Sequence, residues 1–280
     1  SMPELPEVET IRKTLLQLVK HKTIEDVTVF WPKIIKYPDD VEQFKFLCRD
    51  QTIHDIGRKG KFLLFELDDY VLVSHLRMEG KYRLESSTTE IDKHTHVIFT
   101  FTDGDQLRYH DVRKFGTMHL FPRGQEADQR PLNQLGPDPF EDHFTLDYFY
   151  KKCQATTRTI KAVLLDQTVV AGLGNIYVDE TLFHAGIHPL TRANQLTKSE
   201  VAKIQKYAKL TLEKAVAQGG TTIRSYVNGE GEMGMFQQEL YVYGQQDKPC
   251  RTCGQAIIKM KVAGRGTHVC PSCQPEARSS

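Results

Sequence analysis

The stretch P-E-L-P-E-V-E at residues 3–9 opens an amphipathic helix and puts a proline and a glutamate at its start. As an N-terminal residue, Pro3 would carry a secondary amine with a free lone pair, whereas inside a chain the same nitrogen is a tertiary amide. An α-amino group titrates at about pH 8, so part of it is unprotonated at neutral pH and can attack a carbon to form an iminium. Glu4 could supply a proton to such a reaction. The alternative is a plain acidic helix start, which Pro6 and Glu7 would suit.

Outward from this stretch, the first half of the chain predicts one helix and then a series of strands. Apolar residues recur at helical spacing from Val8 to Leu18, which predicts a helix over residues 6–20 with one face against a core. Short β-rich runs bounded by turn residues follow at 23–30, 52–56, 61–67, 70–76, 96–101, 106–112 and 117–121. Regularly spaced short strands of this kind are typical of an antiparallel sandwich.

The second half of the chain is predicted to be helical. Residues 122–143 are rich in Pro, Gly and Asp and indicate an interdomain linker. Helical patterns follow at 145–153, 157–166, 175–185 and 197–217, and two glycines then end the last helix. The expected fold class is therefore α+β with several domains: an N-terminal antiparallel β-sandwich with a flanking helix, followed by a helical C-terminal part.

Length and composition limit the possible functions only loosely. With 280 residues, 39% of them hydrophobic, the chain is long enough for two domains and a buried core. We expect no membrane span and no secretory signal, because no apolar run approaches the roughly 20 residues that cross a bilayer. The net charge is only +1, but residues 151–280 carry 17 Lys and Arg against 10 Asp and Glu. This basic second half is a weak indication of a polyanionic partner.

The cysteines give the strongest local signal. Four of the six form two C-x-x-C pairs with sixteen residues between the pairs: Cys250, Cys253, Cys270 and Cys273. Each pair can grip one metal ion from a tight turn, and four thiolates match the closed tetrahedral site of structural zinc. Without a secretion signal, a metal is favoured over disulfides. We therefore expect one structural zinc ion per chain, and buried thiols at Cys48 and Cys153.

Four further segments allow both a functional and a purely structural interpretation. The segment 166–180 links two helices with Asn175 at an N-cap, where backbone amides could hold a phosphate, or it is an ordinary capped hairpin. The glycine-rich segment 218–236 could close over a ligand or be a plain loop. R-K-G-K at 58–61 could bind phosphate or protect a strand edge. G-R-G at 264–266 could be a hairpin tip that reaches a phosphate, or a solvated turn.

Taken together, these motifs resemble the bacterial formamidopyrimidine-DNA glycosylase family, bifunctional enzymes that remove 8-oxoguanine and ring-opened purines. The resemblance covers residues 3–274 and rests on six motifs in order: P-E-L-P-E-V-E, R-K-G-K-F, S-H-L-R-M-E-G (74–80), D-V-R-K-F-G (111–116), the segment 166–180 and the four paired cysteines. It implies a catalytic β-sandwich domain at 3–133, a helix–two-turn–helix DNA-binding domain at 134–246 and a four-cysteine zinc finger at 247–274, with a β-hairpin between its cysteine pairs.

The resemblance implies a base-excision repair reaction at the start of the chain. Pro3 would attack C1′ of the flipped-out nucleotide and release the base, and the iminium would then allow β- and δ-elimination to cut the strand on both sides. Glu4 would be the general acid at the sugar ring oxygen. Lys61 would steady the phosphate next to the lesion, and Arg265, which contacts a phosphate near the flipped nucleotide, would belong to the same catalytic group.

The resemblance also implies a DNA interface. Phosphates near the flipped nucleotide would be contacted by His75, Asn175, Tyr243 and Lys259. Met78 would plug the gap left by the extruded base, Phe115 would wedge between base steps, and Arg113 would hydrogen-bond the orphaned cytosine. Recognition of the lesion base would fall to Glu79, Thr221, Ile223, Arg224, Ser225 and Tyr226.

The implied partner is double-stranded DNA with an oxidised purine opposite cytosine, bound by a monomer in the bacterial cytoplasm with the nucleoid. Two alternatives stay open. One is a glycosylase and lyase for oxidised pyrimidines, against which the set of Met78, Arg113 and Phe115 argues. The other is a non-catalytic protein that binds damaged DNA, which would follow if Ser1 and Met2 stayed ahead of the proline and blocked its amine.

Overall fold

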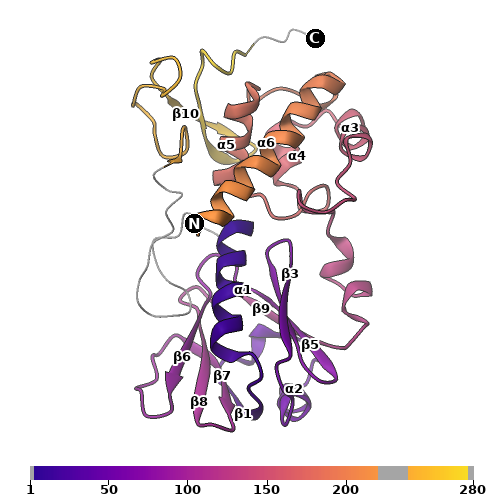
Figure 1. Ribbon diagram of the computed structural model, residues 1–280, viewed down its shortest axis with the longest axis vertical. Coiled ribbons are helices and arrows are strands. Elements are labelled where there is room, and N and C mark those ends of the chain that lie inside the picture. The colour runs from indigo at the N-terminus through magenta and orange to yellow at the C-terminus, as the bar shows by residue number, and fades with distance from the viewer. Residues whose placement is uncertain (1–2, 220–238, 277–280) are drawn as a thin grey trace. The chain divides into compact units, whose positions relative to one another are not determined.

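The computed structural model describes residues 3–219 and 239–276. These residues form two compact units, unit 1 up to residue 134 and unit 2 from residue 135 onward. Unit 1 is a β-sandwich with two helices, and unit 2 is helical with a β-hairpin (Figure 1). This confirms the expected fold class. Among the described residues, no helix is long and apolar enough to cross a membrane.

Unit 1 contains two β-sheets. The four-stranded sheet has the order β1 (Ile24–Val29), β7 (Thr95–Phe101), β8 (Asp105–His110) and β6 (Lys81–Ser86). The five-stranded sheet has the order β2 (Ile35–Tyr37), β9 (Thr117–Pro122), β5 (Tyr70–His75), β4 (Phe62–Glu66) and β3 (Asp55–Lys59). All neighbouring strands pair antiparallel except β2 and β9, which are parallel. The prediction of an antiparallel sandwich therefore fails only at this one edge pair.

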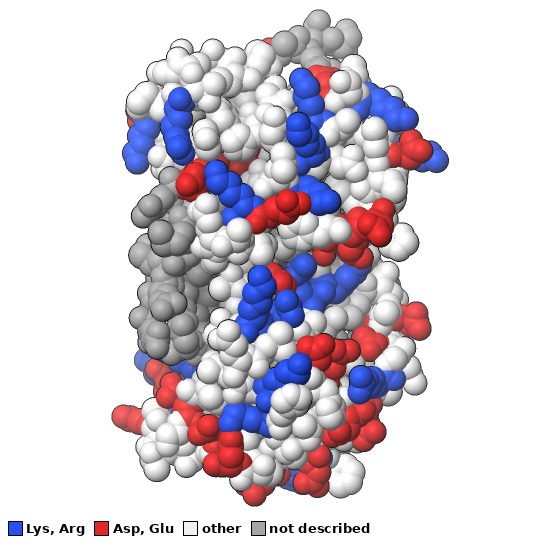
Figure 2. Space-filling model, viewed as in Figure 1, with Lys and Arg blue, Asp and Glu red and all other residues white. Residues whose placement is uncertain are grey.

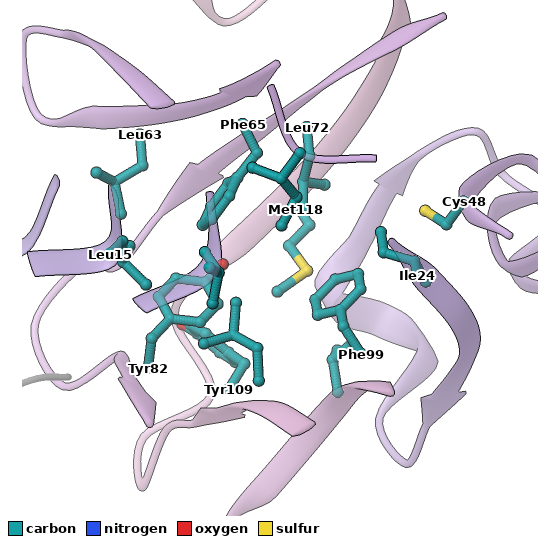
Figure 3. Close-up of a cluster of buried hydrophobic side chains, with 14 of the residues drawn as sticks. Leu15, Ile24, Cys48, Leu63, Phe65, Leu72, Tyr82, Phe99, Tyr109 and Met118 are labelled. Carbon is teal, nitrogen blue, oxygen red and sulfur yellow. The ribbon is translucent and has the colours of Figure 1, made fainter. Parts of the chain in front are cut away.

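The core of unit 1 takes side chains from both sheets and from helix α1 (Leu5–Val19). Successive side chains of a strand point to opposite faces, so Leu107 and Tyr109 of β8 both enter the core. Phe65 of β4, Met118 of β9 and Leu15 of α1 belong to the same cluster (Figure 3). Burying a side chain of this size stabilises a fold by about 1.5–3 kcal/mol. A second helix, α2 (Val41–Cys48), adds Phe44.

A capping box and a proline in the first turn mark the start of helix α1. Glu4 is the N-cap residue, and Pro6 occupies the first turn, where a missing N–H costs no helical hydrogen bond. Glu4 and Glu7 form a reciprocal capping box, in which the Glu4 backbone N–H donates to Glu7 Oε1 at 2.8 Å. The residues that suggest a chemical site therefore also fix how the chain enters the helix.

Unit 2 is built from helices and one hairpin. Its described elements are α3 (Leu146–Gln154), α4 (Ile160–Leu165), α5 (Asn175–Ala185), α6 (Lys198–Ala217), β10 (Ile258–Val262) and β11 (Arg265–Val269). Threonine side chains cap α3, α4 and α6 by accepting a backbone N–H in the first turn. Nine of the eleven residues of α5 are buried, so Asp179 and Glu180 as well as its apolar side chains face protein.

Several predicted details are wrong. Strand β3 begins at Asp55 and not at residue 52, and β2, β6 and α2 were not predicted. The N-cap of α5 is Gly174, so Asn175 is the first helical residue and its side chain is used elsewhere. The hairpin turn is Ala263 and Gly264, with φ of 53° and 75°, as a two-residue turn with left-handed positions requires. Arg265 therefore begins β11 instead of forming the tip.

Candidate functional site

The start of α1 buries both residues of the predicted catalytic pair. Pro3 is buried, and Glu4 is only 2% exposed. One turn further on, Glu9 Oε1 accepts hydrogen bonds from Arg12 at 2.8 Å and from Arg58 of β3 at 3.1 Å. Burial would raise the pKa of Glu9, but these two guanidinium groups outweigh burial and lower it. Helix α1 is thereby tied to β3, which holds Pro3 and Glu4 on a rigid element.

Lys61 directly precedes β4, next to the position where Phe62 of β4 pairs with His75 of β5. Both side chains are buried. His75 Nδ1 accepts the backbone N–H of Arg77 at 2.9 Å, so the neutral ring carries its hydrogen on Nε2. Burial first, and then the positive charges of Arg77 and Lys61, lower the pKa of His75 to about 3. The ring is therefore neutral at pH 7 and can donate one hydrogen bond from Nε2.

Two loops of unit 1 bring together the three residues predicted to enter the DNA. Arg113 Nη1 lies 3.7 Å from Met78 Sδ, and the Arg113 guanidinium lies 5.1 Å from the centroid of the Phe115 ring. Phe115 is 50% exposed, although a large aromatic side chain is usually buried. Glu79, beside Met78, is half-buried. An exposed apolar ring next to a cation is suited to insertion between stacked bases.

The predicted DNA contacts of unit 2 gather around the hairpin. Asn175 Nδ2 donates to the Gly266 carbonyl at 2.9 Å. Lys259 lies opposite His268 in the β10–β11 register, and the Tyr243 ring packs edge-on against His268 with centroids 4.7 Å apart. The residues brought together in this way are Asn175, Tyr243, Lys259 and Arg265.

A buried ion pair next to the hairpin was missed by the sequence analysis. Lys161 Nζ lies 2.8 Å from Asp179 Oδ1, and both side chains are 0% exposed. Lys161 also donates to Thr267 Oγ1 at 2.7 Å, and Asp179 Oδ2 accepts the His268 backbone N–H at 2.9 Å. One hydrogen-bonded network therefore joins α4, α5 and β11. The only signal in the sequence was that Lys161 is the single charged residue of an otherwise apolar run, I-K-A-V-L-L.

A second buried carboxylate, Glu180 of α5, was also missed. It accepts the backbone N–H groups of Tyr241 at 2.7 Å and of Val242 and Tyr243 at 2.9 Å each. Burial raises the pKa of Glu180 to about 7, although the three hydrogen bonds act in the opposite direction. Glu180 thus attaches the segment that carries Tyr243 to a buried helix.

The four paired cysteines fit a structural zinc ion. Their sulfur atoms all lie within 4.8 Å of one another, with Cys250 to Cys273 at 3.9 Å and Cys253 to Cys270 at 3.5 Å. Backbone N–H groups also approach the sulfurs, such as Thr252 N to Cys250 Sγ at 3.4 Å. Such donors favour thiolates, which are the zinc-binding form. All four positions come from the protein, so the ion is structural.

The remaining predictions concern the lesion base and the surface charge. Thr221, Ile223, Arg224, Ser225 and Tyr226 lie outside the described residues. Lys, Arg, Asp and Glu side chains are interspersed over the face shown in Figure 2, without a single basic stripe on that face. The charge distribution in this view therefore does not by itself mark a DNA-binding surface.

Family comparisons cover most of the chain. Residues 2–118 match the formamidopyrimidine-DNA glycosylase N-terminal domain, and residues 135–227 match the formamidopyrimidine-DNA glycosylase H2TH domain. Residues 247–275 match a zinc finger found in FPG and IleRS. The three matches follow one another in the order of the motifs described above.

Similar proteins match over nearly their full length. The formamidopyrimidine-DNA glycosylase of Oceanobacillus iheyensis is 64% identical over 98% of both chains, and that of Bacillus subtilis is 57% identical over 98% of this chain and 99% of its own. A solved complex of the Lactococcus lactis enzyme with DNA that contains an abasic site is similar, with a TM-score of 0.91 and 43% identity. That match covers 98% of this chain and 100% of the solved one.

Proposed function

The chain belongs to the formamidopyrimidine-DNA glycosylase family of bifunctional base-excision repair enzymes, and on that premise we propose how its own residues carry out the reaction. The observation that carries the proposal is the start of α1. There Pro3 and Glu4 are adjacent and buried, and a capping box fixes the Glu4 backbone. A nucleophile and an acid are thus held together at one end of a rigid helix.

Pro3 is the nucleophile in this proposal. Its amine nitrogen bonds to C1′ of the damaged nucleotide, the bond from C1′ to the base breaks, and the base leaves with a proton. Glu4 donates a proton to the sugar ring oxygen, and the ring opens to an iminium. The iminium acidifies the protons at C2′, so the 3′ phosphate and then the 5′ phosphate are eliminated. This chemistry requires that Ser1 and Met2 have been removed.

Cationic and polar side chains of both units hold the DNA phosphates in this proposal. In unit 1 these are Lys61 and the neutral His75, whose Nε2–H is free to donate because Nδ1 is already bonded to the Arg77 backbone. In unit 2 they are Asn175, Tyr243, Lys259 and Arg265, which the hairpin and its buried network support. Phosphate contacts position the duplex but carry no sequence information.

Met78, Arg113 and Phe115 replace the flipped-out nucleotide. The base must leave the stack before an enzyme can reach its sugar, and apolar wedges lower the cost of the distortion. Arg113 hydrogen-bonds the orphaned cytosine, so the preferred substrate is an oxidised purine opposite cytosine. Glu79 and residues 221–226 complete the recognition of the lesion base.

Three segments of the chain divide the work in this proposal. Residues 3–133 form the catalytic domain, residues 134–246 the helix–two-turn–helix domain and residues 247–274 the zinc finger. The protein works as a monomer on DNA in the bacterial cytoplasm, where the nucleoid lies. Support comes from the family matches to residues 2–118, 135–227 and 247–275, which follow one another in the same order.

Borohydride trapping tests the proposal. Protein whose terminal residue is Pro3, as verified by mass spectrometry, should become covalently linked to DNA with 8-oxoguanine opposite cytosine, because borohydride reduces the iminium to a stable amine. Protein that keeps Ser1 and Met2 should give no adduct. An adduct of equal yield with the blocked chain would disprove the role of Pro3. Faster cleavage of thymine glycol than of 8-oxoguanine would favour the pyrimidine-lesion alternative.

A further inference from the structure

Two loops of unit 1 meet on a single buried hydroxyl group. One loop, residues 76–80, carries Met78, and the other, residues 111–116, carries Arg113 and Phe115. The Tyr109 side chain of β8 is fully buried beneath both. Its hydroxyl donates to Asp111 Oδ2 at 2.9 Å. Burial raises the pKa of Tyr109, so this hydroxyl stays protonated and keeps donating.

The carboxylate of Asp111, also 0% exposed, organises the second loop. Its Oδ1 accepts the backbone N–H groups of Arg113 at 3.2 Å and Lys114 at 3.0 Å. Its Oδ2 accepts that of Gly116 at 2.9 Å, together with the Tyr109 hydroxyl. Four groups therefore donate hydrogen bonds to one buried carboxylate. A different loop conformation would break some of these bonds and leave buried polar groups without a partner, which is costly, so the loop has few alternative conformations.

The two glycines at the loop ends show how closely the loops fit around Tyr109. A Cβ added to Gly116 would collide with the Tyr109 hydroxyl, and so would one added to Gly80. At Gly80 it would also lie 2.6 Å from the Leu76 carbonyl oxygen. The hydroxyl therefore fills space that both glycines leave open, and it couples the loop of Met78 to the loop of Arg113.

We propose that Tyr109 and Asp111 are positioning residues that hold Met78, Arg113 and Phe115 in one preformed arrangement and thereby set the preference for cytosine opposite the lesion. The inference rests on the roles proposed above for these three side chains. Discrimination between opposite bases requires a guanidinium that is held in place, because a mobile one can bond several bases equally well.

The test compares Tyr109→Phe and Asp111→Asn with Tyr82→Phe as the matched control. Tyr82 is also a fully buried tyrosine of the same core, but its hydroxyl bonds Ser74 Oγ at 2.6 Å and is not among the three atoms nearest to a Cβ added at either loop glycine. Cleavage is measured on duplexes with 8-oxoguanine opposite cytosine and opposite adenine. Borohydride trapping on a single-stranded abasic site reports Pro3 chemistry without any opposite base.

For Tyr109→Phe we expect the cytosine-to-adenine preference to fall about tenfold, the size of one lost hydrogen bond to a charged group. The rate of borohydride trapping on the single strand should stay within about twofold of the wild-type rate. A twofold change corresponds to less than about 1 kcal/mol in activation free energy. Tyr82→Phe should keep the preference. In the free protein, Lys114 Nζ lies 4.0 Å from the centroid of the Trp31 ring. A looser loop should therefore increase acrylamide quenching of Trp31 in Tyr109→Phe and Asp111→Asn but not in Tyr82→Phe.

An unchanged preference in Tyr109→Phe and Asp111→Asn would overturn the inference, as would an equal loss of preference in Tyr82→Phe. If one of the two variants does not fold, the other decides. Absence of any single-strand adduct with wild-type protein of verified terminus would contradict the proposed function itself, so the two failures are distinguishable.

Discussion

The buried Lys161–Asp179 pair shows how strongly one residue can affect unit 2. Replacing Lys161 by Met should lower the free energy of unfolding by about 3–5 kcal/mol, because Asp179 would remain buried without its counter-ion. Urea unfolding followed by far-UV circular dichroism measures this. Lys198→Met is the control, since its bridge to Asp147 is exposed and should contribute less than about 1 kcal/mol. Equal effects of the two substitutions would contradict the structural role of the pair.

His75 should make stability depend on pH. Its pKa is about 3 when folded, against 6.5 for an ordinary histidine, so between these values the unfolded chain binds a proton that the folded chain does not. The free energy of unfolding should therefore decrease as the pH falls below 6.5, by about 2 kcal/mol at pH 5 from this group. In His75→Asn, an amide oxygen can still accept the Arg77 N–H, and the decrease should be smaller. If the free energy of unfolding depends on pH in the same way in the wild type and in His75→Asn, the low pKa assigned to folded His75 is contradicted.

At the scale of single residues, the sequence predicted groups whose role is local and missed those whose role depends on distant partners. The four cysteines were recognisable because two short spacings define the site. Lys161 was not, because its partners Asp179 and Thr267 come from segments far along the chain. Asp111 had a local signal, since an aspartate often accepts the N–H two residues on, but its bond to Tyr109 requires the folded core.

Among the elements, α6 offers a clean test of capping. Thr197 and Glu200 form a capping box at its first turn. Thr197→Ala should lower the free energy of unfolding of unit 2 by about 1 kcal/mol, because a backbone N–H loses its acceptor. Thr197→Ser keeps the hydroxyl and should restore most of this loss in thermal unfolding. A serine variant as unstable as the alanine variant would show that the methyl group, and not the cap, matters.

Elements with strong local patterns were predicted well. The apolar stripe of α1 and the turn-bounded strands of the sandwich lie close to their expected positions. Helix α2 was missed although Asp40 caps it through two backbone N–H groups, a signal that was present in the sequence. The parallel pairing of β2 with β9 could not be predicted, because it joins segments about 80 residues apart. Asparagine and glycine are both favoured N-cap residues, so the pair Gly174 and Asn175 does not fix which of the two begins α5.

At the scale of the whole molecule, removal of zinc should weaken DNA binding through unit 2 and leave unit 1 folded. Cys250 and Cys270 share a buried cluster with Phe183, Val242 and Ile257, so Cys250→Ser or chelation should loosen the hairpin and its attachment to α5. DNA affinity should fall roughly 100-fold, the loss of two charge-assisted phosphate contacts of roughly 1.5 kcal/mol each. Electrophoretic mobility shifts measure this loss.

The fluorescence of the single tryptophan serves as the control for the zinc-removal experiment. Trp31 is the single tryptophan of the chain and lies in unit 1, so its fluorescence should not change when zinc is removed. Unfolding of the sandwich on chelation would contradict this independence, and unchanged DNA affinity would show that the finger is dispensable.

The order of sandwich, helical unit and finger was predictable because composition changes along the chain from short strands to helices to paired cysteines. The uneven charge was less informative, since both signs are interspersed on the face in Figure 2. Net charge describes long-range attraction to a polyanion, whereas the contacts depend on individual side chains placed by the fold.

Outside the four zinc-site cysteines, each unit contains one thiol sealed from solvent, Cys48 in unit 1 and Cys153 in unit 2. Both are 0% exposed, and burial raises the pKa of Cys48 and raises that of Cys153 to about 12. An alkylating reagent can therefore modify either one only when its own half of the chain opens. The other four cysteine sulfurs bind the metal and are protected from the reagent. The alkylation rates of Cys48 and Cys153 would therefore measure how often each unit opens, and the two rates could be compared before and after a lesion duplex is added.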